Sequence, residues 1–138
     1  MDITLNGTKA AIVKGIPAHT AKQGSDYATG VSAETVGANS IFLGVVTLPP
    51  GRRTKAHLHQ YHETAMYMIE GDEIDMYSGA NLEHHETMHV GDYVYIPANV
   101  MHVGVNRSAV PAVFVGTRNE ATVNESVVLH PELDSVIP

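Results

Sequence analysis

Three histidines carry the chemistry that this sequence suggests most directly. His57 and His59 stand two residues apart, so on an extended strand both imidazoles project from one face and can reach a single ion. His102 follows Pro97 and Asn99, residue types that favour a reversal of the chain, so it can approach the same ion from a separate strand. Three imidazoles with a nearby carboxylate form a mixed nitrogen and oxygen site. Such a site suits a divalent first-row transition metal better than calcium or magnesium.

The segments that must position these histidines are short and apolar. They are rich in Val, Ile, Tyr and Met, and turn residues separate them at close intervals, a pattern typical of an antiparallel barrel or sandwich. Residues 1–40 lack strong periodicity, so we expect a loop-rich N-terminal arm with one or two short strands. The expected strands lie at residues 41–48, 64–69, 73–77, 86–90, 93–96, 102–106, 112–117 and 126–130. The sequence therefore predicts one all-β domain over residues 1–138, with a barrel core over residues 41–118 and a C-terminal strand and tail over residues 119–138.

Two stretches that contain these histidines resemble the paired motifs of the cupin superfamily. The first family motif, G-x5-H-x-H-x3 or 4-E, matches from Gly51 to Glu63. The second, G-x5-P-x-G-x2-H-x3-N, matches from Gly91 to Asn106, with Asn99 in place of the family glycine. This replacement is mild because both residue types tolerate a positive φ. The resemblance implies a double-stranded β-helix, a jelly-roll barrel that holds one metal ion.

Within the superfamily, the chain is most similar to small single-domain, RmlC-like cupins that are loosely described as sugar-isomerase-like. These share an H-x-H-x2-H-E-T segment, here residues 57–64, and an L-E-H-H segment, here residues 82–85. The resemblance implies functions that range from sugar isomerases and epimerases through dioxygenases and decarboxylases to binding proteins without turnover. It also implies a homodimer, and the edge strands of an open barrel give a physical reason for pairing.

The first motif leaves the fourth metal ligand open. Glu63 has the same parity as the histidine pair, so an unbroken strand would aim its carboxylate at the metal. Seven residues rather than the family's six separate Glu63 from Gly71, however, and counting back from Gly71 puts Thr64 in the place of the family glutamate. A one-residue bulge would restore Glu63 to the site, whereas otherwise His62 or water completes the ligand set. The predicted metal ligands are His57, His59, Glu63 and His102, with His62 as the alternative to Glu63.

A site of this kind permits Lewis-acid chemistry on a small oxygenated metabolite. Three imidazoles and at most one carboxylate leave positions open on a six-coordinate ion, where water or two substrate oxygens can bind. The ion would be Mn, Fe, Ni or Zn, and the catalytic candidates that could move a proton are Glu63, His62 and Tyr67. We expect an isomerase-like or epimerase-like enzyme acting on a sugar or hydroxy-carbonyl substrate. The alternatives are a metal-dependent dioxygenase, a non-catalytic small-molecule-binding or sensor protein, and a barrel whose metal only stabilises the fold.

Composition and charge exclude several other classes of protein. The length of 138 residues fits one domain, and the absence of cysteine excludes disulfides and thiolate nucleophiles. The net charge of −7 argues against sequence-independent binding to nucleic acid. The N-terminal residues lack the features of a signal peptide, and no apolar run approaches the length of a membrane span. We therefore expect a cytoplasmic protein whose partner is a small-molecule substrate.

A second histidine pattern, H-E-x-x-H at residues 85–89, matches the zinc peptidase motif in letters only. That motif requires a helix, which would place both imidazoles on one face. Turn residues bound this run closely on both sides, and strand-forming residues resume directly after it. We therefore expect a solvated strand or turn rather than a peptidase site.

Overall fold

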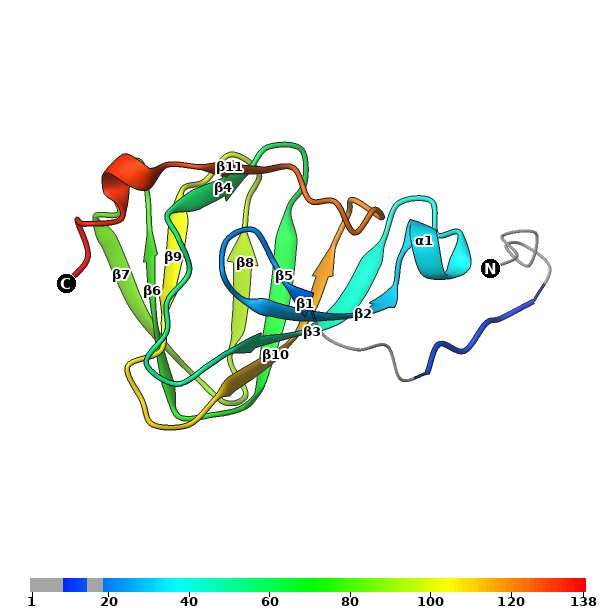
Figure 1. Cartoon of the computed structure of the whole chain (residues 1–138), viewed down its shortest axis with the longest axis horizontal. Coiled ribbons are helices and arrows are strands. Elements are labelled where there is room, and N and C mark those ends of the chain that lie inside the picture. The colour runs from blue at the N-terminus through cyan, green and yellow to red at the C-terminus, as the bar shows by residue number, and fades with distance from the viewer. Residues whose placement is uncertain (1–8, 15–18) are drawn as a thin grey trace.

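Two antiparallel β-sheets face each other across the interior of the protein (Figure 1). The computed structural model describes residues 9–14 and 19–138. The larger sheet has six strands in the order β1 (His19–Thr20), β2 (Asp26–Val31), β3 (Phe42–Leu48), β10 (Ala112–Arg118), β5 (Thr64–Glu70) and β8 (Tyr93–Ile96). The smaller sheet has five, in the order β11 (Val127–Leu129), β4 (His57–His59), β9 (His102–Val105), β6 (Glu73–Ser78) and β7 (His84–His89). This architecture confirms the predicted all-β fold.

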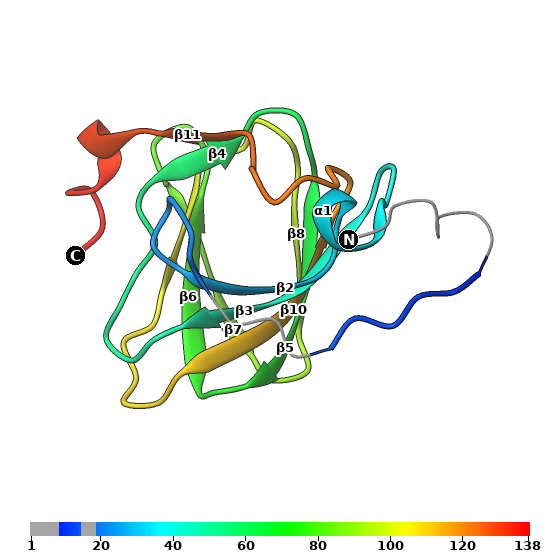
Figure 2. The same ribbon diagram turned by 45° about the vertical axis from the view of Figure 1, so that its right-hand side comes forward.

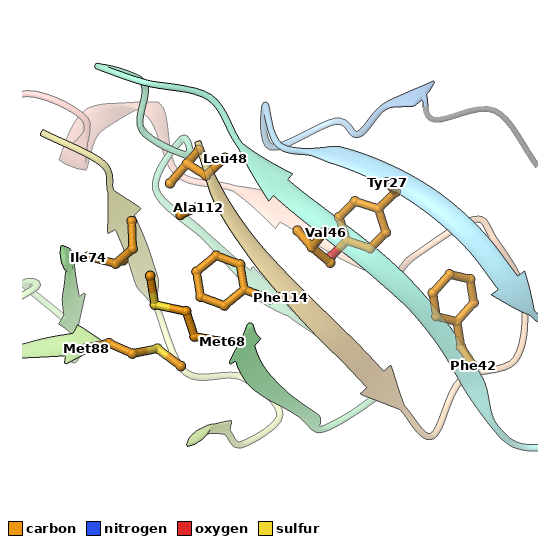
Figure 3. Close-up of a cluster of buried hydrophobic side chains, with 9 residues drawn as sticks. All are labelled: Tyr27, Phe42, Val46, Leu48, Met68, Ile74, Met88, Ala112 and Phe114. Atoms are coloured by element: carbon orange, nitrogen blue, oxygen red, sulfur yellow. The ribbon is translucent and has the colours of Figure 1, made fainter. Parts of the chain in front are cut away.

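Alternation of side chains along the strands builds the core between the sheets. In β3, Phe42, Val46 and Leu48 are buried, whereas Leu43 and Val45 are 42% and 38% exposed on the outer face. Figure 3 shows nine buried side chains that form one cluster, and three of them, Met68, Met88 and Ile74, come from β5, β7 and β6. The expected strands over the barrel core are therefore found, because each places one apolar face against the other sheet.

The N-terminal part of the chain contributes more to the larger sheet than a loop-rich arm would. Strand β2 pairs with β3 along its length, and β1 pairs with β2. A short helix, α1 (Ala33–Val36), follows β2, and its capping box joins Ser32 to Thr35. Residues 9–14 extend away from the barrel in both views (Figures 1 and 2). A 3₁₀ helix (Pro131–Leu133) follows β11 near the C-terminus.

The turn between β8 and β9 directs His102 toward the histidine pair. Asn99 has φ of 63°, the left-handed conformation for which the family motif uses glycine. Its backbone N–H donates to the carbonyl of His59 over 2.8 Å, so the turn is attached to the strand that carries the pair. The mild replacement of glycine by asparagine is confirmed at this turn.

In the part of the chain that the structure describes, no helix has the length and apolar character needed to cross a membrane. The H-E-x-x-H run lies on β7, where His85 contacts Asp75 over 2.9 Å on the solvent-exposed side. The expectation that this run forms no helical peptidase motif is therefore confirmed.

Candidate metal centre

The three histidines predicted to bind a metal converge inside the barrel. Strands β4 and β9 are paired so that His57 lies directly opposite His102, and His59 follows two residues later on the same face. The ring centroid of His102 lies 4.2 Å from that of His57 and 4.8 Å from that of His59. All three side chains are buried, and one ligand atom from each lies within 4.8 Å of the others. Two strands thus bring the imidazoles to one point.

Backbone carbonyls orient two of these rings for metal binding. The Nδ1 atom of His57 lies 2.6 Å from the carbonyl oxygen of Lys55, and Nδ1 of His102 lies 2.9 Å from that of Val100. A carbonyl oxygen only accepts, so Nδ1 donates in both rings and Nε2 keeps its lone pair. Nε2 of His59 is buried and has no hydrogen-bond partner within residues 9–14 and 19–138. These donor atoms fit a divalent transition metal.

Burial also keeps the three imidazoles in the neutral form that a metal requires. Together with the neighbouring His57, it lowers the pKa of His102 to about 3. Burial likewise lowers the pKa of His57 and of His59, and for His59 the nearby imidazoles add to the effect. Because a metal competes with protons for the ligand nitrogen, a cluster that is already neutral at neutral pH is ready to bind an ion.

Glu63 does not reach the histidines, contrary to the expected geometry. Its carboxylate lies on the exposed side, where it accepts a hydrogen bond from the Tyr95 hydroxyl over 3.2 Å. The parity argument fails because β4 ends at His59 and the chain turns before β5 begins at Thr64. Thr64 faces inward instead, with its hydroxyl oxygen 3.4 Å from Nδ1 of His59. The count back from Gly71 was therefore the one that matched the structure.

Tyr67 also lies outside the cluster, so it is poorly placed for the catalytic role expected of it. It is 37% exposed on the outer face of the larger sheet, and its ring lies 4.7 Å from that of Tyr93. Within β5, Met66 and Met68 take the opposite side from Tyr67, because successive side chains of a strand point to opposite faces.

His62, in contrast, joins the cluster. Its side chain is buried and stacks on His59, with ring centroids 4.5 Å apart. Nδ1 of His62 lies 3.0 Å from a carboxylate oxygen of Glu120. Nε2 has no hydrogen-bond partner among the residues that the structure describes. Of the residues predicted as alternatives to the three ligands, His62 is the one that the fold brings to the site.

Glu125 completes the polar cluster and was not predicted from the sequence. One of its carboxylate oxygens lies 3.6 Å from Nε2 of His59 and 3.8 Å from Nε2 of His62. The other lies 3.5 Å from the guanidinium of Arg118, which is itself buried. Glu125 stands in the connection between β10 and β11, where no motif or strand pattern marks it. A weak signal was available for Arg118, a cation that ends a buried strand.

An interior cavity of about 60 Å³ adjoins the histidines. By the same measure one water needs roughly 10–15 Å³, so there is room for a few small ligand atoms. Its lining combines the three ligand histidines with apolar side chains, among them Met66, Met88 and Phe114. Gln23 and Tyr27 line both this cavity and a second hollow of about 380 Å³, which also borders Glu125. Burial, with the charge of Glu125, raises the pKa of Tyr27, so its hydroxyl stays protonated.

A jelly-roll barrel with three inward histidines at these two motifs defines a cupin. The Cupin domain family matches residues 44–117, more than half of the chain, and the protein belongs to that family.

The chain is 30% identical to the tetracenomycin polyketide synthase protein TcmJ of Streptomyces glaucescens, over 75% of this chain and 66% of that protein. It is 41% identical to the polyketide synthase CurC of Streptomyces cyaneus, over 40% of this chain and 36% of that protein. The matched regions thus span less than two-thirds of these relatives.

A solved structure described as a sugar phosphate isomerase from Silicibacter pomeroyi also has this fold. Its TM-score to the chain is 0.61 at 19% identity, covering 86% of this chain and 77% of that one. This likeness establishes the fold alone.

Proposed function

We propose that this protein is a metal-dependent enzyme that acts on a small oxygenated substrate, with isomerase or epimerase chemistry as the first candidate. The observation that carries the proposal is the cluster of three buried, neutral imidazoles beside an interior cavity. His57, His59 and His102 would hold the ion. When bound, a divalent Mn, Fe, Ni or Zn ion would act as a Lewis acid on a carbonyl or enediolate oxygen.

The surrounding residues support this chemistry in distinct ways. Apolar side chains such as Met66 and Phe114 exclude bulk water from the reacting atoms, which strengthens each polar contact inside the cavity. Tyr27 lines the same cavity, and its hydroxyl, whose pKa is raised by burial and by Glu125, stays protonated and is a possible hydrogen-bond donor to a substrate oxygen. Of the proton-transfer candidates, only His62 lies within the cluster, with Nε2 available and Nδ1 held by Glu120. It replaces Glu63 and Tyr67 in that role.

A second candidate function is action on a carbonyl-rich polyketide intermediate. Sequence similarity to TcmJ over 75% of the chain favours this substrate class. A 1,3-dicarbonyl group offers two oxygens to a metal, and its enolisation needs the same Lewis-acid assistance as isomerisation of a hydroxy-carbonyl compound. The inner cavity would accept only the reacting end of such a molecule. The larger hollow beside Gln23 and Tyr27 would accommodate the rest.

Metal analysis of the purified full chain tests the proposal. We expect about one transition metal ion per chain, which His102→Ala abolishes while the protein remains folded. His84→Ala is the matched control, because His84 is exposed on β7 away from the cluster. A wild-type chain that takes up no transition metal would overturn the proposal.

A thermal-shift screen of the metal-loaded protein then separates the substrate classes, because a ligand that binds the folded state raises its apparent stability. Stabilisation by sugar phosphates or hydroxy acids supports the first candidate, whereas stabilisation by aromatic 1,3-diketones supports the second. Zinc as the native ion would exclude the dioxygenase alternative. Bound ligand without any turnover would identify a binding or sensor protein instead.

A further inference from the structure

Glu125 reaches the histidine cluster, whereas the motif glutamate, Glu63, does not. It lies in the connection between β10 and β11, more than sixty residues after Glu63, and its side chain is 9% exposed. One carboxylate oxygen, Oε2, lies 3.6 Å from Nε2 of His59 and 3.8 Å from Nε2 of His62. Ligand atoms of these three residues lie within 4.8 Å of one another. Glu63, by contrast, is exposed, and its carboxylate accepts a hydrogen bond from the Tyr95 hydroxyl.

The atoms that converge here make no hydrogen bond with one another. Nδ1 of His62 faces a carboxylate of Glu120, which only accepts, so in the neutral ring Nδ1 carries the proton and Nε2 presents a lone pair. Nε2 of His59 and Nε2 of His62 are both buried and have no hydrogen-bond partner in the described part of the chain. Two nitrogen atoms and one carboxylate oxygen therefore point at each other. Buried polar atoms of this kind require a partner, and a cation bound by His59 would also satisfy the carboxylate oxygen of Glu125.

The rest of Glu125 is held so that Oε2 remains directed at the histidines. Its other oxygen, Oε1, lies 3.5 Å from Nη1 of Arg118 and 3.4 Å from Nε2 of Gln23, which donates to it. Arg118 is fixed in turn, because its guanidinium donates to the carbonyl of Thr122 over 2.6 Å and lies 3.7 Å from the centre of the Phe42 ring. The carboxylate is thus positioned before any ligand arrives.

We propose that Glu125, and not Glu63, is the carboxylate ligand of the metal centre formed by His57, His59 and His102. This inference rests on the proposed metal site. His59 connects the two groups of ligand atoms, because it belongs both to the group with His57 and His102 and to the group with His62 and Glu125. The carboxylate comes from a part of the chain that lies outside both histidine motifs. It adds one negative charge to a site that otherwise has only neutral ligands, which strengthens binding of a divalent cation.

Binding of Co²⁺ to the full-length metal-free chain tests the assignment. In Glu125→Gln we expect the affinity, measured by calorimetry, to fall at least about tenfold, since even loss of an outer ligand partner commonly costs that much. The visible absorption spectrum of bound Co²⁺ should also change, because one ligand is replaced. Glu63→Gln is the matched control and should keep the wild-type affinity and spectrum.

The outcomes separate this inference from the proposed function. Wild-type affinity and spectrum in Glu125→Gln, or a comparable loss in Glu63→Gln, would overturn the role of Glu125 while the three-histidine site stands. A wild-type protein that binds no Co²⁺ would overturn both. If Glu125→Gln does not fold, Glu125→Asp keeps the charge beside Arg118 but withdraws the oxygen. Glu125→Asp should also bind Co²⁺ at least about tenfold more weakly. Unchanged affinity in that variant would equally refute the assignment.

Discussion

Mild acidification should destabilise the metal-free protein through its buried histidines. Burial lowers the pKa of His102 from its ordinary value to about 3. In the unfolded chain the same imidazole titrates at about pH 6.5. Between these two values the unfolded state binds more protons than the folded state, so stability falls as the pH falls. The contribution is fully present above the unfolded pKa and is lost progressively below it.

The size of the effect follows from the shift at His102. Lowering the pH from about 7 to about 5 should cost about 2 kcal/mol for this histidine alone. Burial also lowers the pKa of His57 and His59, so their protonation should add to this loss in the same direction. The loss at His102 alone is already large against a total stability of about 5–15 kcal/mol for a typical domain. Mild acid should therefore remove a large part of the free energy of unfolding.

Urea unfolding of chelator-treated protein, followed by circular dichroism at several pH values, measures this loss. His102→Gln removes one titrating group, so the loss between about pH 7 and about pH 5 should shrink by about 2 kcal/mol. His84→Gln, on the exposed side of β7, should leave the pH dependence unchanged. Equal free energies of unfolding at the two pH values in the wild-type protein would refute the reasoning.

Three further predictions concern stability and assembly. Met68 is fully buried in the core cluster, so Met68→Ala should lower the free energy of unfolding in urea by about 2–5 kcal/mol. Ile69→Ala, at the neighbouring position that is 45% exposed, should cost less. Equal losses in the two variants would contradict the assigned core. Gly71 has φ of 123°, and a Cβ there would lie 2.9 Å from backbone atoms of Pro111 and Ala112. Gly71→Ala should therefore lower the melting temperature more than Gly51→Ala, where a Cβ meets no neighbour within 4 Å, and the reverse order would contradict this. The expected homodimer should form through the outer face of the larger sheet, where directly opposed residues of neighbouring strands make one apolar row, Val45, Val115, Tyr67 and Tyr93. Light scattering should show a dimer that Tyr93→Glu converts to a monomer, whereas a monomeric wild-type chain would disprove the pairing.

The sequence determined the elements whose signals are local. Short segments rich in Val, Ile, Tyr and Met, separated by turn residues at close intervals, predicted the strands of the barrel. The spacing of His57 and His59 placed both rings on one face, and Asn99 marked the turn that returns His102 to them. Each of these features depends on residues that are neighbours in the chain or belong to one motif.

Only the tertiary structure decided which other side chains meet the three histidines. Parity predicted Glu63, but that argument required an unbroken strand, and the chain turns between β4 and β5 so that Thr64 faces inward. The placement of Glu125 depends on the path of the connection after β10 and on its contacts with Arg118 and Gln23, which no local pattern encodes. Glu125 is distant in the chain from the histidines and from Gln23. The packing of the two sheets sets the direction of the connecting loop, so these contacts depend on the tertiary structure rather than on any local preference.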